Sequence, residues 1–163
     1  MKLRSLFKKI NKEKKGASAI EIVAGMMMFL VIMSFMVDIA MLTWKFQIIS
    51  QTNTYIARTV GIQGGLLVSM PDGFPGGNES YITYSEMESK VKNNMNKAGI
   101  EEYSFNVTPG EIDYGDSIDT RVVAEYKWQL TSNFIPGEIT NDIKSDRTVF
   151  SEFKYRYDSF KGE

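Results

Sequence analysis

The 163 residues of this chain include no cysteine and no histidine, which excludes a disulfide framework, a thiolate metal site and a histidine general base. The 19 basic and 20 acidic residues nearly balance, but residues 1–16 carry a net charge of +6 and residues 17–163 carry −7. The acidic balance beyond residue 16 argues against nucleic-acid binding, because phosphates require a basic footprint.

A basic head precedes a long apolar run. Because lysine and arginine resist crossing a membrane, we expect the head to stay in the cytoplasm and the C-terminal part to lie outside it. As a helix, the run from Ile22 to Trp44 would be about 34 Å long, enough to cross a hydrocarbon core of about 30 Å. We predict a single span, with Trp44 and Lys45 as an interfacial anchor whose ammonium lies in water.

Two acidic residues, Glu21 and Asp38, interrupt this pattern. A charged side chain at the membrane centre costs about 2.5–3.5 kcal/mol on insertion scales. Glu21 lies at the cytoplasmic edge, where a lone carboxylate would simply be solvated. Asp38 lies past the middle of the run. It is either tolerated near the outer interface or pairs with a cation of another subunit during assembly.

Gly16 stands directly before Ala17, and Glu21 is the fifth residue counted from Ala17. Together with the basic head and the apolar run, this arrangement resembles the precursors of bacterial type IV pilins and pseudopilins, in particular the TadE-like minor pilins of tight-adherence and related secretion systems. The resemblance implies that a prepilin peptidase cuts between Gly16 and Ala17. It also implies that Glu21 meets the free amine of a neighbouring subunit in the fibre. Ala17 stands where major pilins commonly have phenylalanine, as it does in many TadE-like members.

Two other interpretations of the N-terminal segment are open. An ordinary secretory signal peptide has an apolar core of only about 7–15 residues, followed by an A-x-A-like site. Here Ile39-Ala40-Met41-Leu42 continues the apolar run instead. A plain signal anchor would need neither Gly16 nor Glu21.

Beyond Trp44, apolar residues recur three and four apart, as on one face of an amphipathic helix. We therefore predict that the membrane helix continues as an amphipathic arm to about Gly61; a separate short helix after a kink is the alternative. Residues 61–79 are rich in glycine and proline, which is typical of a loop. The apolar face of the arm comprises Phe46, Ile48, Ile49, Thr52, Tyr55, Ile56 and Val60.

The remaining residues predict a short helix and three strands. Ser85 and Glu88 have the spacing of a capping box, which predicts a helix over 86–98 that ends at Gly99. Apolar and polar residues then alternate, as in strands with one wet face. The predicted strands cover residues 103–107, 118–130 and 148–157, and the turns between them include Pro109-Gly110, Pro136-Gly137 and Asn141-Asp142.

These elements predict an α+β fold. A small antiparallel sheet with one apolar face must cover it, and the arm and the short helix are the available partners. The resulting architecture is the one that the pilin resemblance implies. We divide the chain into a basic cytoplasmic leader (1–16), a transmembrane helix (17–45), its amphipathic extension (46–61) and an extracytoplasmic α+β head (62–163).

We predict no catalytic residue, metal ligand or cofactor. Asp113, Asp116 and Asp119 have the wrong spacing for an EF-hand loop; a solvated turn is the favoured interpretation and weak calcium binding the alternative. We expect a structural protein of the cell membrane that joins a surface pilus or secretion filament. Its expected partners are the membrane, a prepilin peptidase, other pilin subunits and the assembly platform. The alternative is a single-span surface protein whose head binds a protein or an envelope polymer.

Overall fold

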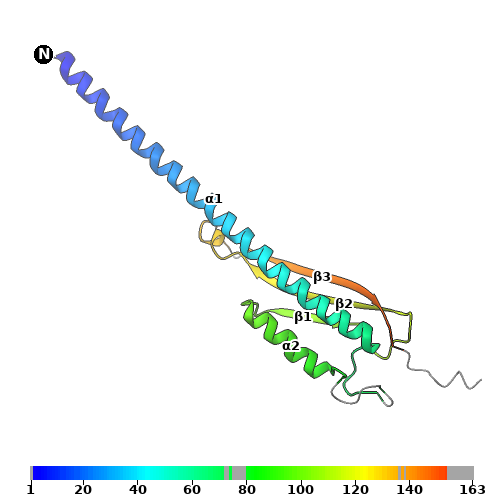
Figure 1. Ribbon diagram of the computed structural model, residues 1–163. Helices are drawn as coiled ribbons and strands as arrows, with labels where there is room; N and C mark the ends of the chain where they lie inside the picture. Colours follow the sequence, from blue (N-terminus) through cyan, green and yellow to red (C-terminus); the bar gives the residue numbers. More distant parts are fainter. Residues whose placement is uncertain (1, 72–73, 75–79, 136, 138, 154–163) are drawn as a thin grey trace, which may run out of the picture. The chain divides into compact units, whose positions relative to one another are not determined.

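The computed structural model describes residues 2–71, 74, 80–135, 137 and 139–153, with side chains from Ser18 onward. The fold is α+β, with one long helix, one short helix and a three-stranded antiparallel sheet (Figure 1). In chain order the elements are α1 (Lys2–Gln63), α2 (Tyr84–Lys97), β1 (Tyr103–Val107), β2 (Ser117–Lys127), a short 3-10 helix η1 (Thr131–Asn133) and β3 (Thr140–Phe150).

The chain divides into two compact units. The first unit comprises Met1–Met41 and Trp128–Ile139, and the second comprises Leu42–Lys127 and Thr140–Glu163. Helix α1 contributes to both, because it runs uninterrupted from Lys2 to Gln63. The helix therefore continues beyond Trp44 without the break that the alternative prediction required.

The sheet of the second unit has the order β1-β2-β3, with both pairs antiparallel. In the register, Phe105 of β1 lies opposite Val122 of β2, and Ala124 lies opposite Ile143 of β3. Strand β2 alternates between buried and more exposed residues, which confirms the predicted face. The buried positions of β2 are Ile118, Thr120, Val122, Ala124 and Tyr126.

The predicted arm of α1 supplies one buried helix face to this unit. Ile49, Ile56 and Val60 are at most 1% exposed, as expected from their spacing of seven and four residues on one helix face. Helix α2 supplies a second buried face through Met87, Val91 and Met95. The core therefore consists of two helical stripes and the apolar face of the sheet.

Asn53 is a polar residue within the buried face of α1. It is fully buried, and its amide Nδ2 donates to the Ser145 carbonyl oxygen of β3 at 2.7 Å and to the Thr120 carbonyl oxygen of β2 at 3.4 Å. The Ser145 hydroxyl lies 3.2 Å from the same nitrogen. One side chain thus ties the helix to two adjacent strands.

The start of α2 differs from the prediction. The capping box is formed by Thr83 and Glu86, not by Ser85 and Glu88. The Thr83 amide donates to the Glu86 carboxylate at 3.0 Å, and the Glu86 amide donates to the Thr83 hydroxyl at 3.4 Å. Gln63 explains why the helix begins after Thr83. Its Nε2 donates to the Ile82 carbonyl oxygen and its Oε1 accepts from the Ile82 amide, which holds the chain extended up to Ile82.

The last strand also differs from the prediction. Strand β3 is Thr140–Phe150, so Asn141-Asp142 lies in the strand and not in a turn. Pairing with β2 decides this register, since Asp142 lies opposite Glu125 and Asn141 opposite Tyr126. Residues 154–157 of the predicted strand lie outside the described residues. Strand β2 in turn ends at Lys127, three residues before the predicted Leu130.

We expect Asn53→Ala to lower the stability of the second unit by about 1–3 kcal/mol, because the substitution leaves buried carbonyl groups without their donor. For a domain of this size the melting temperature should fall by about 4–8 °C per kcal/mol. Near-ultraviolet circular dichroism of the full chain in detergent would measure the change. Gln47→Ala, at an exposed position of the same helix, is the matched control, and equal melting temperatures for the two variants would contradict the assignment.

Candidate functional site

The first unit exposes an apolar helix surface. From Ile20 to Val37, the large apolar side chains of α1 are 38–73% exposed. A core helix of a soluble protein buries such residues, and a helix that is apolar all round is typical of a membrane span. Among the described residues, one helical segment, Ser18–Gln63, is long and apolar enough by composition to cross a membrane.

The predicted processing and assembly residues lie at the start of this surface. The backbone of Gly16 and Ala17 belongs to α1, while their side-chain surroundings lie outside the described part of the chain. Glu21 is exposed, between Ile20 at 73% and Ile22 at 60% exposure. The carboxylate is therefore placed on an apolar surface that is open to a neighbouring molecule.

Asp38, the second predicted assembly residue, is fully buried. Its Oδ2 accepts a hydrogen bond from the Thr131 amide at 2.7 Å, and its Oδ1 accepts one from the Leu130 amide at 3.3 Å. Both donors belong to the connection between β2 and β3. A cation of another subunit would have to displace this connection to reach the carboxylate.

An aromatic stack accompanies these hydrogen bonds. The rings of Phe35 and Trp128 lie nearly parallel, at 13°, with their centroids 5.5 Å apart. Phe35 is almost one turn before Asp38, so the stack and the carboxylate lie on the same side of α1. Residues 128–135, which we name the collar, are thus fixed to the helix by one ring contact and by a charge-assisted pair of hydrogen bonds.

The structure corrects the expectation for Lys45. Its side chain is buried at 9% exposure, and its Nζ donates to the Gly99 carbonyl oxygen at 3.1 Å. The same nitrogen lies 5.5 Å from the centroid of the Tyr126 ring. The ammonium therefore does not lie in water but binds just beyond the C-terminal end of α2, where a cation is favoured. Trp44, by contrast, is 48% exposed, and its role as an interfacial anchor stays a prediction.

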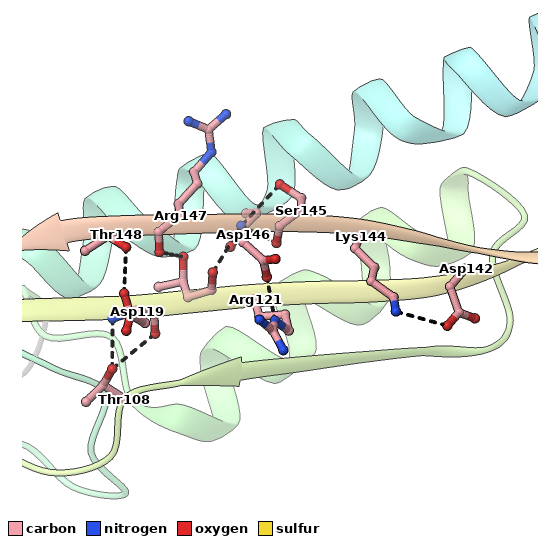
Figure 2. A network of polar contacts seen from close by, with 11 residues as sticks. Thr108, Asp119, Arg121, Asp142, Lys144, Ser145, Asp146, Arg147 and Thr148 are labelled. Carbon is pink, nitrogen blue, oxygen red and sulfur yellow. Dashed lines mark hydrogen bonds and ion pairs between the residues drawn. The ribbon is translucent and has the colours of Figure 1, made fainter.

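A polar network covers the outer face of the sheet (Figure 2). Thr148 donates to the Asp119 carboxylate at 2.6 Å, and the Asp119 amide donates to the Thr108 hydroxyl at 2.8 Å. Arg121 pairs with Asp146, and Lys144 with Asp142. A hollow of about 480 Å³ lies here, lined by Asn106, Val107, Thr108, Pro109, Asp119, Thr120, Arg121, Asp146, Arg147 and Thr148.

Two groups of the second unit have a raised pKa. Burial, with the nearby charge of Glu88, raises the pKa of the Tyr103 phenol. A hydrogen bond shared with the Glu102 carboxyl, followed by desolvation and charge repulsion, raises the pKa of Glu125. The pKa of Glu125 is therefore raised by a neighbouring acid on a solvent-exposed part of the second unit.

Of the acidic residues suggested as a weak calcium site, Asp113 and Asp116 form a backbone turn, while Asp119 lies in β2. The Tyr114 amide donates to the Asp113 carboxylate at 2.9 Å, and the Asp116 amide donates to the Asp113 carbonyl oxygen at 3.1 Å. Within the described ranges, no group of three or more aspartate or glutamate residues is placed to hold a metal ion.

Sequence patterns did not identify the collar, the Asn53 tie or the partner of Lys45. The signal available for Asn53 was a polar residue at a position where helical spacing predicts burial. The signal for the collar was the uncharged sequence Trp128-Gln-Leu-Thr-Ser-Asn-Phe-Ile135, in which half of the residues are apolar. Comparison with known proteins found no matching family model, no matching curated protein and no matching solved structure.

We expect Asp38→Ala to release the collar from α1, because the Leu130 and Thr131 amides lose their acceptor. An unpaired buried donor costs about 1–3 kcal/mol, which corresponds to about 5- to 150-fold faster amide hydrogen exchange at these two positions. Exchange measured by NMR in detergent micelles would detect it. Ser34→Ala, one turn earlier on the helix, should leave both rates unchanged; equal rates in both variants would contradict the role of Asp38.

Proposed function

We propose that this chain is a membrane-anchored minor pilin or pseudopilin, resembling the TadE-like group, which assembles through its N-terminal helix into a pilus or secretion filament. The observation that carries the proposal is the exposed apolar surface of α1 with a carboxylate, Glu21, upon it. The spacing of Glu21 from Gly16 and the basic head supports the same function. An α+β unit built on the continuation of α1 is compatible with it.

The helix surface explains how one element can serve two environments. Apolar side chains on all sides are stable among lipid tails, and they are equally stable against the helices of other subunits. In this proposal the subunit is a single-pass membrane protein before assembly, with its N-terminus in the cytoplasm and the second unit outside. Transfer into the filament exchanges lipid contacts for helix contacts, with the assembly platform as the partner that drives it.

Cleavage would supply the charge that Glu21 needs. A prepilin peptidase that cuts after Gly16 creates a free amine at Ala17. A carboxylate in an apolar bundle is stabilised by an opposite charge within about 4–6 Å. The amine of one subunit and the Glu21 carboxylate of the next therefore form a pair that sets the axial position of the subunits.

The first test is the mature N-terminus. In a host that expresses the matching peptidase, mass spectrometry should show a chain that begins at Ala17, lacking residues 1–16. Gly16→Leu should block the cut because the peptidase must accommodate a bulky residue at the cleavage site. Gly25→Leu, where an added Cβ meets no atom within 4 Å, is the matched control. A chain that still begins at Met1, or is cut elsewhere, would refute the proposal.

The second test concerns the carboxylate. We expect Glu21→Ala to reduce incorporation into filaments by at least about tenfold, equivalent to about 1.4 kcal/mol, while membrane insertion is unchanged. Quantitative immunoblotting of sheared filaments and of membranes would separate these effects. Glu101→Ala, at an exposed acid of the second unit, should behave as the unsubstituted chain.

One observation favours a second candidate function. The hollow on the outer face of the sheet presents hydroxyl, carboxylate and guanidinium groups together, which suits a polar polymer of the cell envelope. In that case the chain is a single-span surface protein and α1 is only an anchor. Unchanged behaviour of Glu21→Ala, combined with loss of polymer binding in Arg121→Ala, would select this function over filament assembly.

A further inference from the structure

We propose that the collar is a second membrane-contacting element, which sits in the outer leaflet beside the span and inserts its exposed apolar side chains at the boundary between acyl chains and headgroups. The inference rests on the membrane insertion of α1 in the proposed function. Leu130, Phe134 and Ile135 are the side chains concerned, at 37%, 46% and 45% exposure.

The position of Asp38 along α1 sets the depth of the collar. From Glu21 to Asp38 the helix rises about 25 Å at 1.5 Å per residue, within a hydrocarbon core of about 30 Å. If Glu21 lies at the cytoplasmic edge, Asp38 lies near the opposite edge, still below the outer headgroups. Phe35 lies slightly deeper and stacks on Trp128. The collar is therefore held at the height of the outer boundary.

Six of the eight backbone amides in the collar have a hydrogen-bond acceptor within the first unit, and such pairing is needed for a segment near lipid. The amides of Leu130 and Thr131 donate to Asp38, and the amide of Trp128 donates to the Ile139 carbonyl oxygen at 3.0 Å. Three further amides follow the short helix η1: Asn133 donates to Leu130 at 3.2 Å, Phe134 to Thr131 at 3.0 Å and Ile135 to Thr131 at 3.3 Å. A loop in water would not need to meet this condition.

The composition of the collar fits the same environment. Residues 128–135 contain no lysine, arginine, aspartate or glutamate, although these account for 24% of the chain. Tryptophan and mixed polar and apolar side chains are typical of the interface. Within the first unit, Phe35 of the exposed apolar surface of α1 stacks on Trp128 of the collar, so the two are in direct contact.

The collar also explains why a carboxylate is tolerated at this height. An unpaired charge in hydrocarbon is costly, and backbone amides that bond both oxygens offset part of that cost. In return, Asp38 holds an irregular segment against the helix where lipid alone would not fix it. The collar amides therefore offset part of the cost of burying the Asp38 carboxylate, and the carboxylate offsets the cost of burying those amides.

The chain lacks cysteine, so a single introduced thiol can report the position of the collar. Ile135→Cys would carry the fluorophore NBD in the full chain, reconstituted into vesicles of phosphatidylcholine and phosphatidylglycerol. Met28→Cys, at 71% exposure on the span, is the lipid control. Ser89→Cys, exposed on α2, is the aqueous control.

We expect a nitroxide placed high on the lipid chain to quench the Ile135 label at least about threefold more than the Ser89 label, and iodide to quench it less. Iodide quenching without lipid quenching, while the Met28 label is quenched by lipid, would overturn the inference and leave membrane insertion intact. Protection from both quenchers would overturn it in favour of a second protein chain as cover. Loss of lipid quenching at Met28 as well would contradict insertion itself.

A second measurement avoids substitution in the collar. Trp44→Phe leaves Trp128 as the sole tryptophan. Brominated lipids should then quench the Trp128 emission, with the strongest effect from bromines near the headgroup. Emission that is insensitive to bromine at every depth would overturn the placement of the collar.

Discussion

Burial of one face of α1 is the constraint on which the second unit depends. The sheet has three strands and one apolar side, and that side must be buried against another element. Ile49, Ile56 and Val60 provide that cover, and Asn53 fixes its register through two strands. The same helix carries the exposed apolar surface, so one element both covers the sheet and provides the segment that is long and apolar enough to cross a membrane.

Two charged residues near the end of the apolar run are both satisfied within the chain. Asp38 binds backbone amides of the collar, and Lys45 binds a carbonyl group beyond the end of α2. The two are seven residues apart on α1, and each uses backbone groups that another element leaves without a partner. Asp38 and Lys45 therefore have hydrogen-bond partners within the chain. In our proposal, Glu21 is the carboxylate that is open to a neighbouring subunit.

The periodicity of apolar residues predicted the helices and most of the strands, but it did not predict the collar. The alternation in β2 and the helical spacing in the arm follow from burial on one side. Thr140–Arg147 has almost no alternation in its polarity, so only pairing with β2 reveals that strand. The partners of Asp38 and Lys45 lie 92 and 54 residues away, where no local pattern reaches them. The roles of Gly16, Ala17 and Glu21 stay predictions that rest on their spacing and on the family resemblance, because the partners that would recognise them are other molecules and not this chain's core.

The charged residues of edge strand β3 influence how copies of this chain interact when they are close together. In the described part of the chain β3 is an edge of the sheet, eleven residues long, and a long edge is a template for pairing with another molecule. Asp142, Lys144, Asp146 and Arg147 place charges of both signs along it. Subunits concentrated side by side in a membrane would have to desolvate these groups to join their sheets. In the proposed filament subunit, the charges of β3 would therefore oppose aggregation through this edge.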